Sequence, residues 1–528
     1  MQRTNPCDRK LVTTVRGSRN RRNIFVRLCF CFGSLEETET RMKWSLVGLA
    51  IAALSLSASA QTPAITRLDG TPISTAEIDA TMTRLLQAAE VTGAAIAVID
   101  QGKIAYQAAY GFRDQERNLP LTVDSVMSAA SITKPTFAYV VMELVDEGLL
   151  DLDKPIYQYL PKPLPEYQKY ADLADDPRYK RITARMLLSH TAGFPNWRWL
   201  EEDRKLRIHF EPGSRFAYSG EGIDLLQLIV ETVTHQPLDH LMQEKVFQPF
   251  GMTRTSMVWQ EKFANDFANG YDEYGRSLGA HQWKHADGAG SMLTTVRDLA
   301  RFLEAVMQGK NLRGQTHQQV LSPQIQITSR HEFPSLNMET TDANKPIRLS
   351  YGLAWGLYWT PYGEAFFKEG HDEGWRNYTV CFTKPQTGIV ILTNSSNGEG
   401  IFKEVLETVL KNNFTPIEWE GYTPYDKLPP RPPLKAHKQV VVEGRVLDRY
   451  VGRYGTLPDM VLTIRREGGH LSLAENEEPK QELLPESESD FYSTSSDDRC
   501  TFQVDSQGRA TGMILHVDGR DIPIKRID

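Results

Sequence analysis

Cysteine is scarce in this sequence, with five residues among 528. Three of them, Cys7, Cys29 and Cys31, fall within the first 41 residues, which leaves Cys381 and Cys500 for the rest of the chain. One disulfide between these two could form in an oxidising compartment. They lie in segments that we interpret below as separate domains, so we expect two unpaired, buried thiols instead.

An excess of positive charge is also missing. Lys and Arg number 60 against 67 Asp and Glu, which gives a formal net charge of −7. Because a nucleic-acid-binding protein normally carries a basic face, we expect no nucleic-acid partner. The remaining proportions, 40% hydrophobic and 24% charged residues, are those of a globular protein. At roughly 150 residues per domain, the length fits two to four domains.

The N-terminal part has no apolar run of membrane-spanning length. Its apolar segment, residues 44–56, is shorter than the about 20 residues that a spanning helix needs. Arg41 and Lys43 precede the segment and an Ala-Ser-Ala site follows it at residues 58–60. This is the pattern of a secretory signal peptide. We predict such a peptide over residues 42–60, with a buried helix or an anchor as the alternative.

The signal peptide has consequences for both of its flanks. Residues 1–41 are Arg-rich and unpatterned, and we interpret them as an extension from an upstream mis-start. Because no cysteine directly follows the cleavage site, we expect no lipid anchor and no other membrane anchor once the peptide is removed. The expected location is therefore secreted or periplasmic.

The next segment, residues 61–425, mixes strand and helix patterns. Residues 93–112 form two apolar runs around Asp-Gln-Gly-Lys, which indicates a hairpin. Apolar residues at helical spacing predict a helix from Ser131 to Leu149, and several more helices between 150 and 300. Another hairpin is predicted in "NYTVCFTKPQTGIVILTN". Strands at both ends with helices between them indicate an α/β (α+β) fold: a mixed, mainly antiparallel sheet flanked by helices, with a helical insert.

A second, smaller unit is expected at the C-terminal side. Residues 426–439 are rich in proline and predict a semi-rigid linker. Short alternating segments with turn residues between them fill residues 440–528. They predict a small all-β domain, either a barrel or a sandwich.

Two common catalytic motifs are missing. No G-x-S-x-G is present, which argues against the commonest scaffold of serine hydrolases. His281 and His285 have the spacing of two metal ligands, but the glutamate of H-E-x-x-H is absent. We therefore predict no metal and no cofactor.

Ser131 and Lys134 offer another route to a nucleophile. Residues three apart on a helix share a face, so the lysine can reach the serine oxygen. A helix N-terminus also supplies a positive field and free N–H groups. Lysine can take the hydroxyl proton only when it is uncharged, which requires burial or a neighbouring cation. The alternative is structural, with the serine as a helix cap and the lysine in solvent.

The motifs and their order resemble the class C β-lactamase-related serine hydrolases, a family that includes esterases and D-amino-acid-directed peptidases. The S-x-x-K serine motif is followed by a Tyr motif and by a basic motif before the last hairpin. The resemblance covers roughly residues 70–405 and implies a β-lactamase/transpeptidase-like sheet and helices. It implies that Ser131 is acylated, that Lys134 and Tyr218 relay the proton, and that His371 is the third basic residue. The resemblance to this family is also supported by the stretches "ITARMLLSHTAGFP", "VFQPFGMTRTSM" and "GAGSMLTTVRDLARFL".

The same resemblance places the oxyanion and substrate contacts. The N–H of Ser131 would form half of an oxyanion hole, and Glu373 or Gly374 the other half. Two departures stand out. Gly220 ends the Tyr motif, where the family usually has an amide-binding Asn, and the His-x-Gly motif is shortened to His371-Asp372-Glu373-Gly374. Both departures favour small esters over amides.

The predicted function is that of a secreted serine hydrolase that forms an acyl-enzyme on a small-molecule ester or amide. One alternative is a peptidase or carboxypeptidase for D-amino-acid peptides of the cell wall. Another is a penicillin-binding or sensor protein without turnover. The sequence leaves open the natural substrate, the oligomeric state, the role of the all-β domain, and whether Lys134 or Tyr218 is the resting base.

Overall fold

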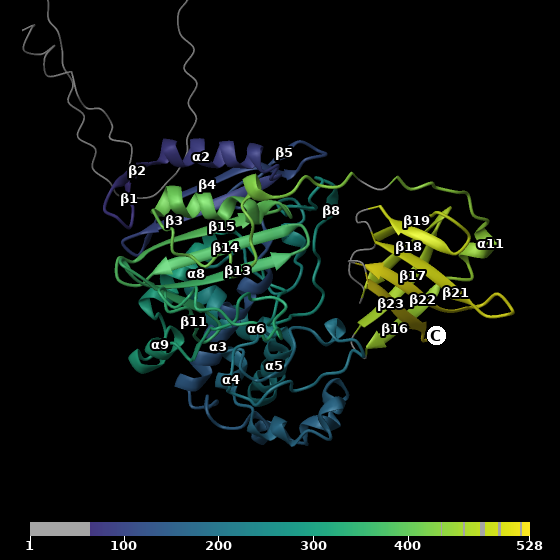
Figure 1. Cartoon of the computed structure of the whole chain (residues 1–528), viewed down its shortest axis with the longest axis horizontal. Helices are drawn as coiled ribbons and strands as arrows, with labels where there is room; N and C mark the ends of the chain where they lie inside the picture. The colour runs from purple at the N-terminus through teal and green to yellow at the C-terminus, as the bar shows by residue number, and fades with distance from the viewer. Residues whose placement is uncertain (1–63, 434–435, 458–459, 476–480, 495–497, 518–519) are drawn as a thin grey trace, which may run out of the picture. The chain divides into compact units, whose positions relative to one another are not determined.

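The structure is a computed structural model that describes residues 64–433, 436–457, 460–475, 481–494, 498–517 and 520–528 (Figure 1). The predicted extension (residues 1–41), the predicted signal peptide (residues 42–60) and the three N-terminal cysteines lie outside this range. Among the helices that the structure does describe, none has both the length and the apolar character to cross a membrane.

A nine-stranded sheet forms the centre of the larger part of the chain. Its paired strands are antiparallel, and the two expected hairpins supply four of them. The strand order is β10 (Ile325–Gln326), β11 (Ser350–Tyr351), β12 (Gly356–Thr360), β13 (Gly363–Asp372), β14 (Trp375–Phe382), β15 (Thr387–Thr393), β3 (Gly93–Asp100), β4 (Lys103–Asp114) and β5 (Leu119–Pro120).

Both faces of this sheet are covered, which explains why β3 is an unbroken apolar run. Ala95, Ala97 and Ile99 pack into a core shared with the helices α3 (Thr133–Asp146) and α8 (Val296–Gln308). The alternate residues of β3 pack into a second core shared with α2 (Thr75–Ala88). Figure 1 shows α2 along one side of the sheet and α8 on the other. A strand with both faces buried has apolar residues at successive positions, whereas a half-buried strand alternates apolar and polar residues.

Helices form in the stretch from 131 to 300 where the apolar periodicity predicts them, and further helices at 75–88, 314–320 and 402–405 were not predicted. The helix expected from Ser131 to Leu149 is α3, preceded by a 3₁₀ turn, η1 (Ala130–Ile132). The helices of the larger part are α2 (Thr75–Ala88), α3 (Thr133–Asp146), α4 (Ala184–Leu188), α5 (Gly220–Thr234), α6 (Leu238–Met242), α7 (Gln248–Phe250), α8 (Val296–Gln308), α9 (Gly314–Val320) and α10 (Phe402–Val405). Three short two-stranded pairs join β1 (Ala64–Thr66) with β2 (Pro72–Ser74), β6 (Met127–Ser128) with β9 (Leu293–Thr294), and β7 (Gly270–Tyr271) with β8 (Ser277–Gly279).

The C-terminal unit is a closed barrel of eight strands, so of the two all-β folds expected it is the barrel that forms. Its core holds Tyr454, Phe491 and Phe502. A short helix, α11 (Gly444–Leu447), precedes it. The strands are β16 (Gly452–Leu457), β17 (Met460–Glu467), β18 (His470–Glu475), β19 (Gln481–Pro485), β20 (Asp490–Ser493), β21 (Arg499–Val504), β22 (Ala510–Val517) and β23 (Arg520–Arg526).

The predicted fold class is confirmed: a mainly antiparallel sheet flanked by helices, with a small all-β barrel. Cys381 and Cys500 are buried and unpaired, as expected. Burial raises the pKa of both thiols above the usual value for cysteine, so neither has the character of a reactive thiolate.

Candidate active site

Ser131 lies in the tight turn between β6 and α3. The preceding residue, Ala130, has φ of 48°, in the left-handed region that non-glycine residues rarely adopt. Thr133 fixes the turn from inside: its hydroxyl donates to the carbonyl of Ala130 at 2.6 Å and accepts from the N–H of Met292 at 3.0 Å. The turn therefore holds Ser131, which is half-buried, at a defined position at the start of α3.

Lys134 reaches back to the serine. Its Nζ lies 3.0 Å from Ser131 Oγ and 2.7 Å from the carbonyl oxygen of Ala289. The residue is only 1% exposed. In the described part of the chain no carboxylate forms an ion pair with Lys134, so both of its partners are neutral oxygens. The predicted contact between the two residues of S-x-x-K is present.

Tyr218 lies beside this pair, just before α5. The centroid of its ring is 5.0 Å from Lys134 Nζ, and the residue is 3% exposed. Its hydroxyl is buried and has no hydrogen-bond partner among the described residues. A buried hydroxyl without a protein partner is unusual, and it is available to a reacting group.

The fully buried His190 packs against this tyrosine, with 4.4 Å between the ring centroids. Burial is the main reason that the pKa of His190 is well below its usual range, and any positive charge on Lys134 or Lys368 lowers it further. The imidazole is therefore neutral, and its Nδ1 accepts from the N–H of Ser219 at 3.3 Å. It shapes the wall behind Tyr218 without adding charge.

The third basic group at this site is Lys368, which the sequence analysis missed. Its Nζ lies 4.8 Å from the centroid of the Tyr218 ring, and it forms an ion pair with Glu369. Lys368-Glu369-Gly370 has the spacing of the K-T-G motif of penicillin-binding proteins and β-lactamases, with glutamate in the middle position. That spacing, directly before the last hairpin, was the signal that could have found it.

Gly370 lets β13 pass close to the serine turn. A Cβ atom at this position would lie 2.4 Å from the carbonyl oxygen of Ala129 and 3.3 Å from a side-chain carbon of Ile132. The neighbouring strand β12 pairs with β13 only as far as Phe367. Beyond Phe367, the edge of β13 is therefore open next to the turn that carries Ser131.

His371, Glu373 and Gly374 are not brought into this cluster. The side chain of His371 is 55% exposed and lies 3.6 Å from Glu399, and no described contact joins it to Ser131, Lys134 or Tyr218. The N–H of Glu373 already donates to Asp372 Oδ1 at 2.9 Å. That of Gly374 donates to Ser396 Oγ at 3.1 Å. Successive side chains of a strand point to opposite faces, so His371 cannot share the side of β13 that Lys368 and Gly370 occupy.

Gly220 begins α5 and lies against an indole. A Cβ atom at this position would lie 2.3 Å from a ring carbon of Trp197. The N–H of Gly220 donates to Asn196 Oδ1 at 3.0 Å. The place where the family usually has an asparagine side chain is therefore filled by Trp197.

His281, one of the two histidines considered for a metal, has other contacts. His281 Nδ1 lies 3.0 Å from Asp372 Oδ2, and its ring stacks on Trp283 with 4.2 Å between centroids. Three carboxylates, those of Glu332, Glu369 and Glu420, have oxygen atoms within 4.8 Å of one another. Glu369 forms an ion pair with the Lys368 ammonium. A cation from the protein itself therefore already lies at this carboxylate cluster.

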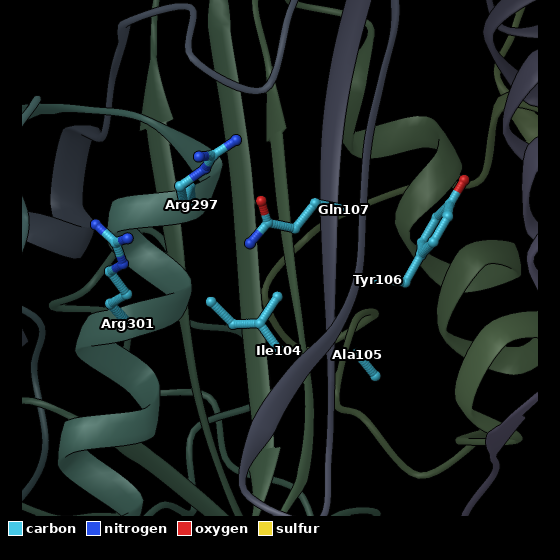
Figure 2. Close-up of a pocket in the computed structure, with 6 residues that line it drawn as sticks. All are labelled: Ile104, Ala105, Tyr106, Gln107, Arg297 and Arg301. Carbon is cyan, nitrogen blue, oxygen red and sulfur yellow. The ribbon is translucent and has the colours of Figure 1, made fainter. Parts of the chain in front are cut away.

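A separate surface hollow of about 470 Å³ lies between β4 and α8 (Figure 2). None of the residues around Ser131 lines it. Figure 2 shows Arg297 and Arg301 on α8 on one side and Gln107 on β4 facing them. The lining residues are Ile104, Ala105, Tyr106, Gln107, Arg297 and Arg301.

The sequence model of the β-lactamase family matches residues 78–411. The chain belongs to the class C β-lactamase-like serine hydrolase family. A domain of unknown function, DUF3471, matches residues 437–526, which include the barrel.

Individual relatives carry several names. A penicillin-binding protein of Bacillus subtilis is 23% identical over 459 residues, which are 80% of this chain and 92% of that protein. The esterase EstB of Burkholderia gladioli is 31% identical over 246 residues, 41% of this chain and 60% of the esterase. An octameric penicillin-binding protein homologue from Pyrococcus abyssi has the same fold, with a TM-score of 0.54 and 21% identity over 86% of this chain and all of that one.

Proposed function

We propose that this β-lactamase-family protein hydrolyses small esters through an acyl-enzyme at Ser131. The observation that carries the proposal is the 3.0 Å contact between Lys134 Nζ and Ser131 Oγ, with Tyr218 beside it. Lys134, as a neutral amine, takes the hydroxyl proton while Oγ bonds to the acyl carbon. Tyr218 passes a proton to the leaving alcohol, which departs with the electrons of the broken C–O bond, and Lys134 returns its proton to the Tyr218 oxygen. Water then adds to the acyl carbon as Lys134 takes its proton. The bond from the acyl carbon to Ser131 Oγ breaks, and Lys134 gives that proton to Oγ, which releases the acid and the free serine.

Two backbone N–H groups are proposed to hold the oxyanion. One belongs to Ser131, at the start of α3. The other belongs to His371, the residue after Gly370, because the open edge of β13 passes next to the serine turn there. One such donor contributes about 2.7–4 kcal/mol to transition-state stabilisation in a serine protease. In this proposal the backbone N–H of His371 contributes to the oxyanion hole, and its side chain has no role. Lys368 is the third basic residue.

Esters are the preferred substrate class because of Gly220 and Trp197. The indole of Trp197 fills the space where an asparagine would bind a substrate amide. An ester needs no such contact, and the similarity to an esterase of the same family fits this preference. The similarity to a penicillin-binding protein keeps acylation by penicillin without turnover as a competing possibility. Hydrolysis of D-amino-acid peptides is the other alternative, which the resemblance in the sequence leaves open.

The test measures initial rates on nitrophenyl butyrate, nitrocefin and a D-alanyl anilide for the wild type and Ser131→Ala. Mass spectrometry follows the protein mass during each reaction. We expect ester turnover with a transient acyl adduct, and neither in Ser131→Ala. Comparable rates on nitrocefin and the ester would remove the ester preference. A persistent adduct without product would indicate a sensor, and full activity of Ser131→Ala would refute the mechanism.

We also propose that the protein is exported and that the mature chain begins after Ala60. Sequencing the N-terminus of protein recovered outside the cytoplasm tests this. An N-terminus upstream of Met42 would contradict both the signal peptide and the interpretation of residues 1–41.

A further inference from the structure

Two buried lysines approach the ring of Tyr218 in unequal surroundings. Lys134 Nζ lies 5.0 Å from the ring centroid and Lys368 Nζ lies 4.8 Å from it. Lys134 contacts two neutral oxygens, whereas Lys368 contacts the carboxylate of Glu369 and its carbonyl oxygen. The two Nζ atoms are nearly equidistant from one aromatic ring, and among the described residues an anionic partner is found for Lys368 and not for Lys134.

Glu369 is one of three buried carboxyls that share this region. Oxygen atoms of Glu332, Glu369 and Glu420 lie within 4.8 Å of one another, and each residue is nearly inaccessible to solvent. Glu332 Oε2 and Glu420 Oε1 have no hydrogen-bond partner among the described residues. Glu420 also accepts from the Tyr378 hydroxyl at 2.7 Å. One ammonium cannot neutralise three carboxylates, so the three residues differ in charge.

Burial and mutual repulsion decide which of them stay neutral. Burial first, and then the charge of Glu369, raise the pKa of Glu332 and Glu420 well above the usual value. Burial and the neighbouring charge therefore favour the protonated form of both carboxyls. Burial alone would lower the pKa of Lys368, but Glu369 raises it above the ordinary value for lysine. Of the three carboxyls, that of Glu369 is the one with a described ion pair to Lys368.

We propose that Glu369 is a positioning residue whose carboxylate holds the Lys368 ammonium beside Tyr218, so that of these two lysines it is Lys134 that takes the Ser131 proton. The inference rests on the proposed function and deepens it, because it assigns different tasks to two otherwise similar lysines. A charged Lys368 supports the tyrosine electrostatically, and the amine of Lys134 carries the proton. The titratable groups that face Lys368 are Glu369, Tyr218, Glu332, Glu420 and His190, and Lys134 lies on the same tyrosine ring.

Three isosteric variants test the proposal. Glu369→Gln, Glu332→Gln and Glu420→Gln each remove one carboxyl, and only the first removes a charge that the proposal requires. The readout is kcat/KM for nitrophenyl butyrate between pH 5 and about 11, the range over which an ordinary lysine titrates. Glu369→Gln should move the alkaline limb down by about 1–3 pH units, the usual effect of losing an opposite neighbouring charge. The two control variants should keep the wild-type limb.

Each outcome has a definite meaning. An unchanged limb in folded Glu369→Gln, or equal shifts in all three variants, would overturn the proposal. If Glu369→Gln does not fold, Lys368→Gln is compared with Lys368→Gln/Glu369→Gln, which buries no unpaired charge. Equal pH profiles of these two support action through Lys368, and a further shift in the double variant overturns it. Ser131→Ala runs beside them: if it stays active, the proposed function has failed, whatever the glutamate variants do.

Discussion

The Nζ atom of Lys368 lies 4.8 Å from the centre of the Tyr218 ring, in a position that His371, on the other side of the same strand, does not reach. We therefore expect Lys368→Gln to lower kcat/KM for an ester by about 100-fold or more, the usual scale for loss of a charge-stabilising group. His371→Gln should change it less than about twofold, as for other exposed side chains. A steady-state comparison of the two purified variants checks this. Equal losses of kcat/KM in the two variants would contradict the assignment of the third basic residue to Lys368 instead of His371.

Lys134 provides the second prediction, which separates its charge from its basicity. Lys134→Met removes both, while Lys134→Arg keeps a cation that cannot give up its proton. Since the proposed role is that of a base, both variants should lose about 10²–10⁴-fold in the rate of adduct formation. Rapid-mixing mass spectrometry with an activated ester measures that rate. Substantial activity of the arginine variant would mean that Lys134 acts through its charge.

The first turn of α5 offers a matched pair of glycines. A Cβ atom at Gly220 would meet the Trp197 ring at 2.3 Å, whereas one at Gly222 would meet only Ser219 Oγ, at 3.3 Å, and other side-chain atoms at 3.5 Å or more. Gly220→Ala should therefore destabilise the fold by about 1–3 kcal/mol, the typical cost of overpacking. Gly222→Ala should be neutral or slightly stabilising, because alanine favours a helix. Urea unfolding of both variants gives the comparison, and equal stabilities would contradict the tight packing of Trp197.

Glu143, on the buried face of α3, gives a prediction about pH. Burial raises its pKa to about 7 from an ordinary value of 4.5. The folded state therefore keeps a proton that the unfolded state releases between these values, so the residue costs stability as the pH rises from about 4.5 to 7. Glu143→Gln should gain up to about 3 kcal/mol over the wild type at pH 8, at about 1.4 kcal/mol per pKa unit.

The same comparison should show almost no difference at pH 4, where both states hold the proton. Glu147→Gln serves as the control, because that side chain is 44% exposed and pairs with Lys245 at the surface. Its free energy of unfolding should follow the wild type at both pH values, as surface ion pairs contribute little. An equal gain for both variants at pH 8 would show that the effect is one of net charge.

Much of the fold was predictable because local patterns decide it. The two hairpins follow from apolar runs around turn residues, and α3 follows from apolar spacing together with an early proline. The contact of Ser131 with Lys134 was predictable for the same reason, since residues three apart on a helix share a face. Tyr218 was found only through the order of the motifs, because nothing local brings it to the serine.

What the sequence could not provide depends on register and on long-range packing. Taking His371 as the third basic residue moved the motif three positions along β13 from Lys368, and an odd shift in a strand exchanges its two faces. Glu332 and Glu420 lie in loops far from Glu369 in the sequence, and no periodicity links them. The meeting of Trp197 with Gly220 also depends on how a loop folds back onto a helix.

The strand pairing of the barrel also determines when the domain can complete its folding. β23 pairs with β22 along its length and with β16 through Tyr454 and Gly455, so the barrel is closed by the last of its own eight strands. Until that strand leaves the ribosome, β16 and β22 each present an unsatisfied edge, which is a template for intermolecular strand addition. The domain can therefore complete its folding only after its translation is finished, and a nascent or truncated chain that lacks β23 is the form most prone to aggregate.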